Sequence, residues 1–405
     1  MAAAARTIRD PPQIVEFAAD GEEYGVQPGG NHSSFRGDAR GGSADRSEIG
    51  GNGTQVTMRT ERIGAVAIGR NEGERLRRCL AALNRQTRQI VYVDSGSTDG
   101  SVELARSLGV EVLELERSVP FTAARARNAG FERLRQRWPT IEYVQFVDGD
   151  MEILEHWLTI AAAVLDDRPE VFAVWGCRRE RHPERSVYNR ICDVEWRIGL
   201  AGASANFGGD VMIRGGAFTK VGGYASHVIA AEDDELGIRL RAAGGVLQRI
   251  DQNATLHDAD MYRFKQWWIR ATRCGYAYAQ VSSLHRSLGE RKFVRELKRA
   301  GLLGAIVPTG AVALGLTIPS LFWLVVGLYP INAARIAWGS RRRGFSWADS
   351  AAWGASCALA PIPQALGAAR YYLHLLFDKR PEIIEHKPPL QITRLRSEIV
   401  DDKRE

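Results

Sequence analysis

Between residues 63 and 148, four short apolar runs alternate with segments of helical periodicity, and this alternation constrains the fold more than any other feature. The runs are Ile63–Ile68, Gln89–Asp94, Glu111–Leu115 and Tyr143–Asp148. Strands that alternate with helices predict an α/β fold with a doubly wound, mixed but mostly parallel sheet. In such sheets, ligands bind beyond the carboxyl ends of the strands. The polar residues that directly follow each run are therefore the first candidates for a functional site.

By composition, the chain divides into four parts. Residues 1–60 are rich in Gly, Ser, Asp and Arg, which predicts a disordered extension. Residues 61–285 carry the alternating pattern and are expected to form the main domain. Residues 286–378 hold a basic flank followed by hydrophobic helical segments, and residues 379–405 form a charged tail.

The overall composition excludes several classes of protein. With 45% hydrophobic and 25% charged residues among 405, the chain is neither wholly disordered, nor collagen-like, nor a many-spanning transporter. Its formal net charge of +6 is diffuse, so no nucleic-acid partner is expected. The five cysteines are widely scattered and lack a Cys-x-x-Cys pair, which indicates a reducing compartment rather than a zinc or redox site.

The segment Gly301–Ala334 contains no charged residue and is long enough to cross a bilayer, which requires about 20 apolar residues. Its three prolines suggest a kinked or broken helix, or a span with an interfacial extension. Ser350–Ala369 is a weaker second span because two prolines interrupt it. The basic stretch 286–299 favours a cytoplasmic side before the first span. These features predict an anchor in the cytoplasmic membrane, with the main domain in the cytoplasm.

Other arrangements of the hydrophobic segments stay open. A hairpin made of these two runs would place Arg341, Arg342 and Arg343 on the outer face, which the positive-inside rule opposes. A re-entrant or surface-lying arrangement avoids that conflict. Buried core helices of a soluble domain are a further alternative, although tryptophans near the segment ends favour a membrane interface.

Three acidic groups follow predicted strands or open a predicted helix. They are Asp94, the pair Asp148 and Asp150, and the run Glu232–Glu235. Two carboxylates separated by one small residue can converge on Mg²⁺ or Mn²⁺, which prefer oxygen ligands. Asp94 can accept hydrogen bonds from a nucleobase or a ribose, and Asp233 can act as a general base.

Each acidic group also has an ordinary structural interpretation. Asp-Gly-Asp can be a simple turn at the end of a strand. Asp94 can cap the following helix, although Ser97 or Thr98 can serve as that cap instead. Asp233 can be a first-turn acid that complements the helix dipole.

The acidic groups belong to a collinear set of motifs. In chain order these are Ala-Ile-Gly-Arg-Asn71-Glu72, Val-Asp94-Ser-Gly-Ser-Thr-Asp99-Gly-Ser, Ala-Arg127-Asn128-Ala-Gly130, Val-Asp148-Gly-Asp150, Gly222-Gly223-Tyr224 and Ala-Glu232-Asp233-Asp-Glu235-Leu. Through them, residues 63–258 resemble the family-2 inverting glycosyltransferases with the GT-A fold, of the membrane-associated bacterial type. The resemblance implies transfer of a sugar from a nucleotide-sugar to an acceptor hydroxyl, with inversion and with help from a divalent Mg²⁺ or Mn²⁺.

The resemblance also implies a role for each matching position. Asp94 would hold the base or ribose of the donor, in a pocket that Asn71 and Glu72 line. Arg127 would approach the diphosphate or sugar, Asp148 would contact the ribose or sugar, Asp150 would bind the metal, and Asp233 would be the catalytic base. His257 stands where the family often has a further metal or phosphate ligand. The acceptor would be a glycan or a lipid-linked intermediate.

Some positions depart from the family pattern, and two rival functions stay open. Arg70 stands where many members have an aromatic residue near the nucleobase, and Ser95 replaces a common second Asp. Gln266-Trp-Trp-Ile-Arg270 is only distantly similar to the Gln-x-x-Arg-Trp motif of processive synthases, so processivity is not predicted. The rivals are a sugar-nucleotide nucleotidyltransferase of related fold, whose Gly-rich loop is absent, and a catalytically inactive membrane scaffold.

Overall fold

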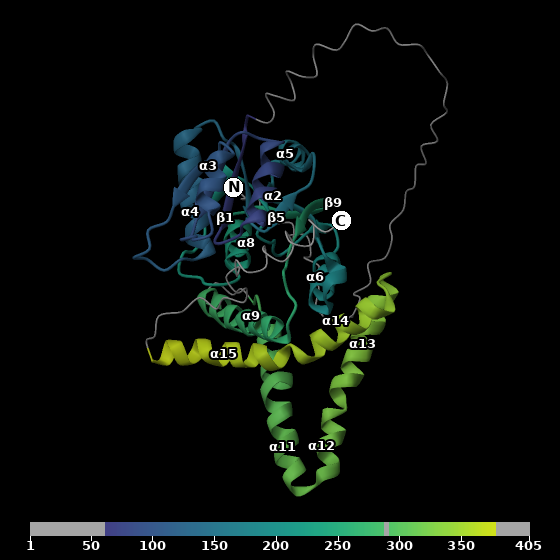
Figure 1. Ribbon diagram of the computed structural model, residues 1–405. Coiled ribbons are helices and arrows are strands. Elements are labelled where there is room, and N and C mark those ends of the chain that lie inside the picture. Colours follow the sequence, from purple (N-terminus) through teal and green to yellow (C-terminus); the bar gives the residue numbers. More distant parts are fainter. Residues whose placement is uncertain (1–60, 287–290, 378–405) are drawn as a thin grey trace, which may run out of the picture.

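The computed structural model describes residues 61–286 and 291–377. The disordered extension predicted for residues 1–60 and the charged tail predicted for residues 379–405 lie outside the described residues. Within them, an α/β domain is followed by a layer of helices, from which a helical hairpin projects (Figure 1).

A mixed sheet forms the centre of the domain. Its strands run in the order β3-β2-β1-β4-β8-β6-β9-β5, with β7 paired to β9. The first four strands are mutually parallel, and β8 joins antiparallel to both β4 and β6. The bounds are β1 (Ile63–Gly69), β2 (Ile90–Asp94), β3 (Glu111–Glu114), β4 (Tyr143–Asp148), β5 (Met151–Ile153), β6 (Val171–Glu180), β7 (Gly202–Ala203), β8 (Met212–Arg214) and β9 (Val246–His257).

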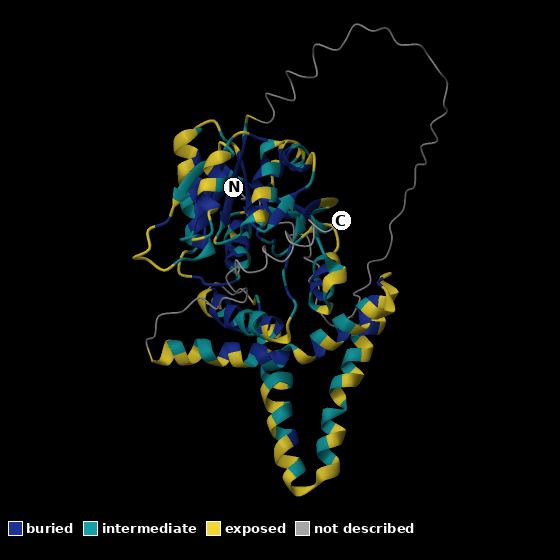
Figure 2. Ribbon diagram, in the orientation of Figure 1, coloured by how far each residue is buried: buried dark blue, intermediate teal, exposed yellow. Residues whose placement is uncertain are grey.

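Helices cover both faces of the sheet and bury its apolar side chains (Figure 2). On one face lie α2 (Glu74–Asn84), α3 (Ser101–Ser107) and α5 (Trp157–Asp167). On the other lie α4 (Ala123–Arg137), α7 (Gly215–Lys220) and α8 (Glu232–Ala242). In α2, Leu76, Leu80 and Leu83 recur at helical spacing, so all three reach the sheet and are fully buried.

The parallel register brings the polar strand ends together. Gly69 at the end of β1 is paired with Asp94 of β2, and Ile68 is paired with Asp148 of β4. Asp94 and Asp148 therefore lie on either side of the β1 carboxyl end, as expected for ligand-binding edges of α/β sheets. The α/β class and mixed sheet predicted from the sequence are confirmed.

Further helices form a layer beside the domain (Figure 1). α9 (Phe264–Leu284) packs against α15 (Pro361–Leu376), and α14 (Trp347–Leu359) packs against α6 (Val187–Arg197). The α9–α15 contact depends on glycine, because a Cβ on Gly275 would lie 1.9 Å from the Gln364 carbonyl oxygen. Ser350–Ala369, considered above as a second span, is thus divided between α14 and α15 and packs into this layer.

The uncharged segment 301–334 forms parts of two helical legs that meet at Ile318. The first leg contains α10 (Val294–Arg299), the π-helical η3 (Ala300–Ile306) and α11 (Val307–Thr317). The second contains α12 (Pro319–Val326) and α13 (Leu328–Arg342). Each leg, Val294–Thr317 and Pro319–Arg342, is long and apolar enough to cross a membrane. The hairpin is therefore made within one apolar run, and not from the two runs considered in the sequence.

Candidate active site

Asp94 holds the turn that follows β2. Its side chain is buried and accepts hydrogen bonds from the Tyr92 hydroxyl (3.0 Å) and from the backbone N–H groups of Gly96 (2.9 Å) and Ser97 (2.8 Å). Gly96 takes a φ of +82°, which the turn requires and which other residues rarely adopt. The carboxylate thus fixes the shape of the loop at the edge of the sheet.

Asn71 joins this loop to the one after β1. Its backbone N–H donates to the Ser97 hydroxyl (2.9 Å), and its side-chain oxygen accepts from the Thr98 N–H (2.8 Å). The prediction that Ser97 or Thr98 caps the next helix was wrong, because α3 begins later, at Ser101, with Gly100 at its N-cap. Both residues instead connect the two loops that border the candidate nucleotide pocket.

Phe121 supplies an aromatic ring at this end of the site. The guanidinium carbon of Arg70 lies 5.9 Å from the centre of the Phe121 ring, and a Cβ on Gly96 would lie 3.1 Å from that ring. Phe121 belongs to the segment between β3 and α4. Position 70 carries Arg rather than an aromatic residue, and the aromatic ring comes instead from a loop distant in sequence, which was not predicted.

The Asp-Gly-Asp turn meets His257 where β5 pairs with β9. Met151 pairs with His257 in the sheet, and Asp150 Oδ2 lies 3.2 Å from His257 Nε2. Both side chains are largely buried, and the His257 ring packs on Trp196 with centroids 4.6 Å apart. The carboxylate and imidazole predicted as metal ligands are therefore adjacent.

A carboxylate oxygen beside an imidazole nitrogen is a donor set that fits Mn²⁺ or Mg²⁺. Within residues 61–286 and 291–377, however, no group of three or more His, Cys, Asp or Glu side chains forms a complete ligand set. The pair fits a cation whose remaining ligands come from substrate oxygens and water, which is the usual arrangement for Mg²⁺ at phosphates.

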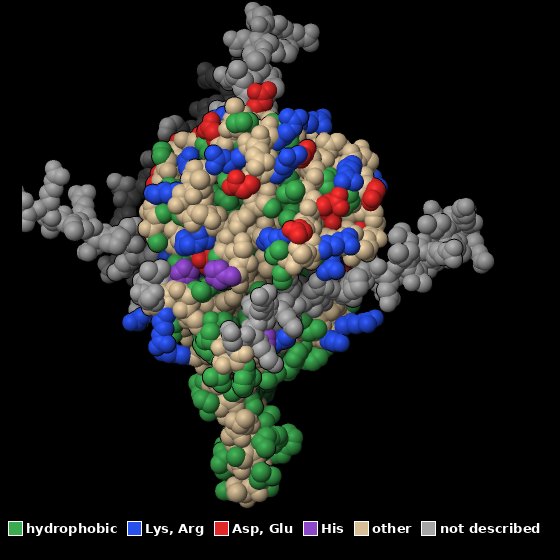
Figure 3. Space-filling model, turned by 90° about the vertical axis from the view of Figure 1, so that its left-hand side faces the viewer, with side chains coloured by type: hydrophobic (Ala, Val, Ile, Leu, Met, Phe, Trp, Pro, Cys, Tyr) green, Lys and Arg blue, Asp and Glu red, His purple; other side chains and the backbone are tan. Residues whose placement is uncertain are grey.

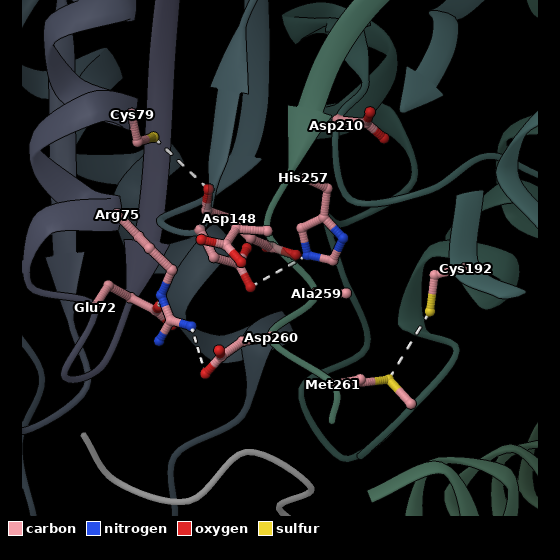
Figure 4. Close-up of polar contacts among 12 residues, drawn as sticks. Glu72, Arg75, Cys79, Asp148, Cys192, Asp210, His257, Ala259, Asp260 and Met261 are labelled. Carbon is pink, nitrogen blue, oxygen red and sulfur yellow. Dashed lines mark hydrogen bonds and ion pairs between the residues drawn. The ribbon is translucent and has the colours of Figure 1, made fainter. Parts of the chain in front are cut away.

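Glu72 connects the loop after β1 to the segment after His257. Its carboxylate lies 2.9 Å from Arg75 Nε, and Arg75 Nη1 lies 3.3 Å from Asp260 (Figure 4). A Cβ on Gly149 would lie 3.3 Å from Glu72 Cγ, so Glu72 also borders the Asp-Gly-Asp turn. Sequence reasoning missed Arg75 and Asp260 because their pairing depends on the fold alone.

Arg127 lies at the centre of an acidic cluster. Its side chain is only 2% exposed, and its guanidinium lies 2.8 Å from Asp148, 2.6 Å from Glu232 and 3.5 Å from Asp233. The guanidinium carbon also lies 5.2 Å from the centre of the Tyr224 ring. One buried cation thus holds three carboxylates from β4 and α8 in fixed positions.

Asp233 is the acid of this cluster with the most altered ionisation. Burial raises the pKa of Asp233 to about 7, with the charges of Glu232, Asp148 and Asp234 adding to the rise and Arg127 opposing it. The Tyr224 hydroxyl donates to Asp233 Oδ1 (3.1 Å) and orients the carboxylate. A carboxyl with a pKa near neutrality is suited to accept a proton at physiological pH.

The neighbouring acids respond differently to the same surroundings. Burial raises the pKa of Asp148, although Arg127 opposes the rise. Burial also acts against ionisation of Glu232, but Arg127 and Arg273 outweigh it and hold the pKa of that carboxyl below its ordinary value. The same surroundings thus separate the pKa values of two adjacent carboxyls, lowering that of Glu232 and raising that of Asp233.

The loop Gly208–Asp210 closes the cluster from the β8 side and was missed in the sequence. Asp210 is buried, pairs with Arg178 and accepts from the Thr255 hydroxyl. A Cβ on Gly209 would lie 2.6 Å from Arg127 Nη2 and 3.0 Å from Asp148 Oδ2. The loop can therefore lie against the Arg127–Asp148 ion pair only because residue 209 has no side chain.

Gly209→Ala should lower activity and stability, since Arg127 is held by three carboxylates and cannot move aside. Overpacking of this kind costs about 1–3 kcal/mol. The control is Gly216→Ala, because a Cβ there meets nothing within 4 Å and alanine favours the α7 helix. Thermal unfolding and turnover of both variants test this. A Gly209→Ala enzyme equal to Gly216→Ala in both measurements would contradict the expectation.

Part of the chain matches a known protein family. Residues 66–222 match the family described as "Glycosyl transferase family 2". With the mixed sheet described above, this match confirms the GT-A fold. Residues 66–222 are therefore similar in sequence to the family-2 glycosyltransferases. The matched segment includes Asn71, Asp94, Arg127 and Asp150, and it ends before Asp233 and His257.

A TPR repeat-containing protein of Synechococcus elongatus is 30% identical over 125 residues, which are 31% of this chain and 29% of that protein. Among solved structures, S. aureus TarS 1-349 is similar over 55% of this chain and 64% of that one, at 15% identity and a TM-score of 0.41. A mannosyltransferase from Pyrobaculum calidifontis is similar over 78% and 88%, at 17% identity and a TM-score of 0.48. The chain thus spans less than two thirds of the curated relative and of TarS 1-349.

Proposed function

We propose that the protein transfers a glycosyl group from a nucleotide-sugar to an acceptor hydroxyl, with inversion at the anomeric carbon. The observation that carries the proposal is Asp233, a buried carboxyl with a pKa of about 7, in one cluster with Asp148 of the Asp-Gly-Asp turn. The family match supports transferase chemistry.

The donor would lie along the edge formed by the ends of β1, β2 and β4. The loops that Asn71 and Asp94 hold would bind the nucleoside, with Glu72 at their border and Phe121 offering a face for the base. Asp148 would contact the ribose or sugar. Since Arg127 is almost inaccessible, it would act on the donor by fixing Asp148 rather than by binding phosphate itself.

Asp150 and His257 would hold a divalent Mg²⁺ or Mn²⁺. Such an ion neutralises the negative charge of a departing nucleoside diphosphate. The two side chains are 3.2 Å apart and largely buried, so the donor diphosphate would meet a site from which bulk water is mostly excluded.

In the reaction, Asp233 would accept the proton of the acceptor hydroxyl while that oxygen attacks the anomeric carbon. The bond from this carbon to the phosphate oxygen breaks, and the nucleoside diphosphate leaves from the opposite side, so the configuration inverts. Tyr224 and Arg127 keep the carboxylate oriented throughout. General-base catalysis of this kind contributes about 10²- to 10⁴-fold.

Activity should rise with pH through about 7, because Asp233 must be ionised to accept a proton. The charge of Glu232 raises the pKa of Asp233, so Glu232→Gln should lower that pKa. Without the Glu232 carboxylate, the positive charge of Arg127 is less neutralised and stabilises the ionised form of Asp233 more strongly. We therefore expect the acidic limb of the kcat/KM profile to move to lower pH in Glu232→Gln. An unmoved limb, or one moved to higher pH, would assign the titration to another group.

The acceptor is proposed to be a glycan or a lipid-linked intermediate at the cytoplasmic membrane, with the catalytic domain on the cytoplasmic side. The two apolar legs of the hairpin support membrane association. The basic residues Arg295, Lys298 and Arg299 precede the uncharged part of the first leg, which supports the cytoplasmic orientation.

Equilibrium binding tests the donor site directly. UDP, GDP and dTDP would be titrated into the full chain by calorimetry, with and without Mn²⁺, and with the matching monophosphates as controls. We expect one diphosphate to bind, more tightly with Mn²⁺ than without it. If none of the three diphosphates binds in either condition, the proposal of a nucleotide-sugar site is wrong. A catalytically inactive scaffold then becomes the better interpretation.

A further inference from the structure

The hairpin of residues 300–342 exposes apolar side chains on all sides. Its two legs are almost unburied, with 11% of the apolar window of the first leg and none of the second inside the protein. Figure 3 shows hydrophobic side chains covering the projection, whereas charged side chains gather on the domain above it. A helix that is apolar all round belongs in a hydrocarbon environment. Examples of its exposed residues are Ile306, Val312, Leu316, Trp323, Leu324 and Ile331.

Several polar groups of the turn between the legs are bonded within the turn itself. The Ile318 N–H donates to the Leu314 carbonyl (2.7 Å), and the Leu321 N–H donates to the Ile318 carbonyl (3.0 Å). The Thr317 hydroxyl also donates to Leu314 (2.9 Å), and Pro319 has no N–H to satisfy. In lipid, backbone groups must be bonded within the protein, and these bonds lower the number that the turn would leave unpaired in hydrocarbon.

Direct contacts also join the two legs. The Tyr329 hydroxyl of the second leg donates to the Leu303 carbonyl of the first. Near the turn, a Cβ on Gly315 would lie 2.8 Å from Phe322 Cβ, so the helices approach closely through glycine, as in membrane helix pairs. A groove of about 270 Å³ beside this contact is lined by Val312, Leu316, Phe322 and Trp323, among others, and leaves room for acyl chains.

Basic residues mark the same end of both legs. Arg295, Lys298 and Arg299 lie at the base of the first leg, and Arg341, Arg342 and Arg343 lie at the base of the second. Trp338 and Trp347 pack at this level with ring centroids 6.0 Å apart, and Arg341 lies over Trp347. Basic and aromatic side chains of this kind sit at the headgroup level of anionic membranes. Because both charge clusters are on one side, the positive-inside conflict considered in the sequence does not arise.

Each whole leg has the length and hydropathy of a candidate span, but its uncharged part is shorter than the hydrocarbon core. Ala300–Thr317 extends at most about 27 Å and Pro319–Ala334 about 24 Å at 1.5 Å per residue, against about 30 Å for the core. From Leu314 to Ser320 the turn carries no charge that could anchor it in the far headgroups. We infer that the hairpin is a monotopic anchor, which enters an anionic bilayer from one face and ends inside the hydrocarbon. The inference refines the membrane association proposed above and is independent of the chemistry.

Flotation with preformed liposomes of equal parts phosphatidylcholine and phosphatidylglycerol tests insertion of the full chain. Leu316, 84% exposed beside the turn, would be changed to Asp, and Leu200, 64% exposed on the domain, would be changed to Asp as the matched control. We expect Leu316→Asp to lower the bound fraction roughly tenfold or more, since a carboxylate near the bilayer centre is costly, and Leu200→Asp to float like the wild type. Equal flotation of the two variants, or wild-type protein that stays in solution as an oligomer, would overturn the inference.

Labelling from the lumen separates a monotopic hairpin from one that crosses. Ser320→Cys protein would be added to liposomes that contain a membrane-impermeant maleimide, which the native cysteines on the outer face cannot meet. We expect no lumenal adduct at position 320, and full labelling after detergent is added, which shows that the thiol is reactive. A lumenal adduct on the inserted protein would show that the turn emerges and would overturn monotopic insertion, while leaving the glycosyltransferase proposal untouched.

Discussion

The Asp233→Asn variant should bind its donor like the wild type and transfer about 10²- to 10⁴-fold more slowly. Asparagine keeps the shape of the side chain, and it can still meet the Tyr224 hydroxyl at the position where the carboxylate accepts it. It cannot take the proton of the acceptor hydroxyl. Single-turnover rates together with calorimetric donor binding separate these two effects.

Stability serves as the internal control for that variant. The pKa of Asp233 is raised from 3.8 to about 7, so above pH 7 its charge opposes folding, and its removal should not lower the melting temperature at pH 8. Asp234→Asn is the matched substitution one residue along α8, where the carboxylate meets Asn206 and Lys292. We expect Asp234→Asn to retain most transfer. Near-normal turnover by Asp233→Asn would place the base at Glu232 or Asp234 instead.

The Asp150→Ala variant should lose Mn²⁺-dependent donor binding and, with it, activity. Residues that merely support metal ligands contribute about 10- to 100-fold, so removal of a direct ligand should cost at least about 100-fold. Wild-type enzyme in excess EDTA should show the same loss, and added Mn²⁺ should restore the wild type but not the variant.

Glu152→Ala is the control for the metal site. Glu152 lies two residues further along, on β5, and its carboxylate pairs with Arg181 rather than with His257. We expect it to keep metal-dependent binding. Undiminished wild-type activity in EDTA, or Asp150→Ala activity equal to that of Glu152→Ala, would exclude a metal held by Asp150.

The sheet edge could be predicted because it depends on short-range pattern and parallel register. Apolar runs that end in Asp94 and Asp148 become buried strands, and parallel pairing with β1 then aligns their ends. The cap at Ser97 or Thr98 could not be predicted correctly, because Ser97 accepts a hydrogen bond from Asn71 of another loop. A cap competes with every partner that the fold brings near, and the sequence does not show those partners.

Other parts of the site and the hairpin arise from long-range packing. No motif in the neighbouring sequence marks Phe121 or Gly209 as a site residue. Their importance comes from contacts with Gly96 and Arg127, which lie on other elements. The apolar run 301–334 predicts one broken span as readily as two legs. A single extended residue, Ile318 (φ −135°, ψ 92°), turns the chain back before Pro319. That choice depends on packing such as Gly315 against Phe322.

Turnover of a donor panel tests nucleotide-sugar transfer most directly. The full chain in detergent or liposomes, with Mn²⁺ or Mg²⁺, would be given UDP-, GDP- and dTDP-sugars, and release of the nucleoside diphosphate would be followed together with the anomer of the first-formed sugar product by NMR. The predicted result is metal-dependent release from one class of donor, with inverted configuration, in wild type and not in Asp233→Asn. Absence of release from every donor, or a product of retained configuration, would contradict Asp233-assisted inverting transfer.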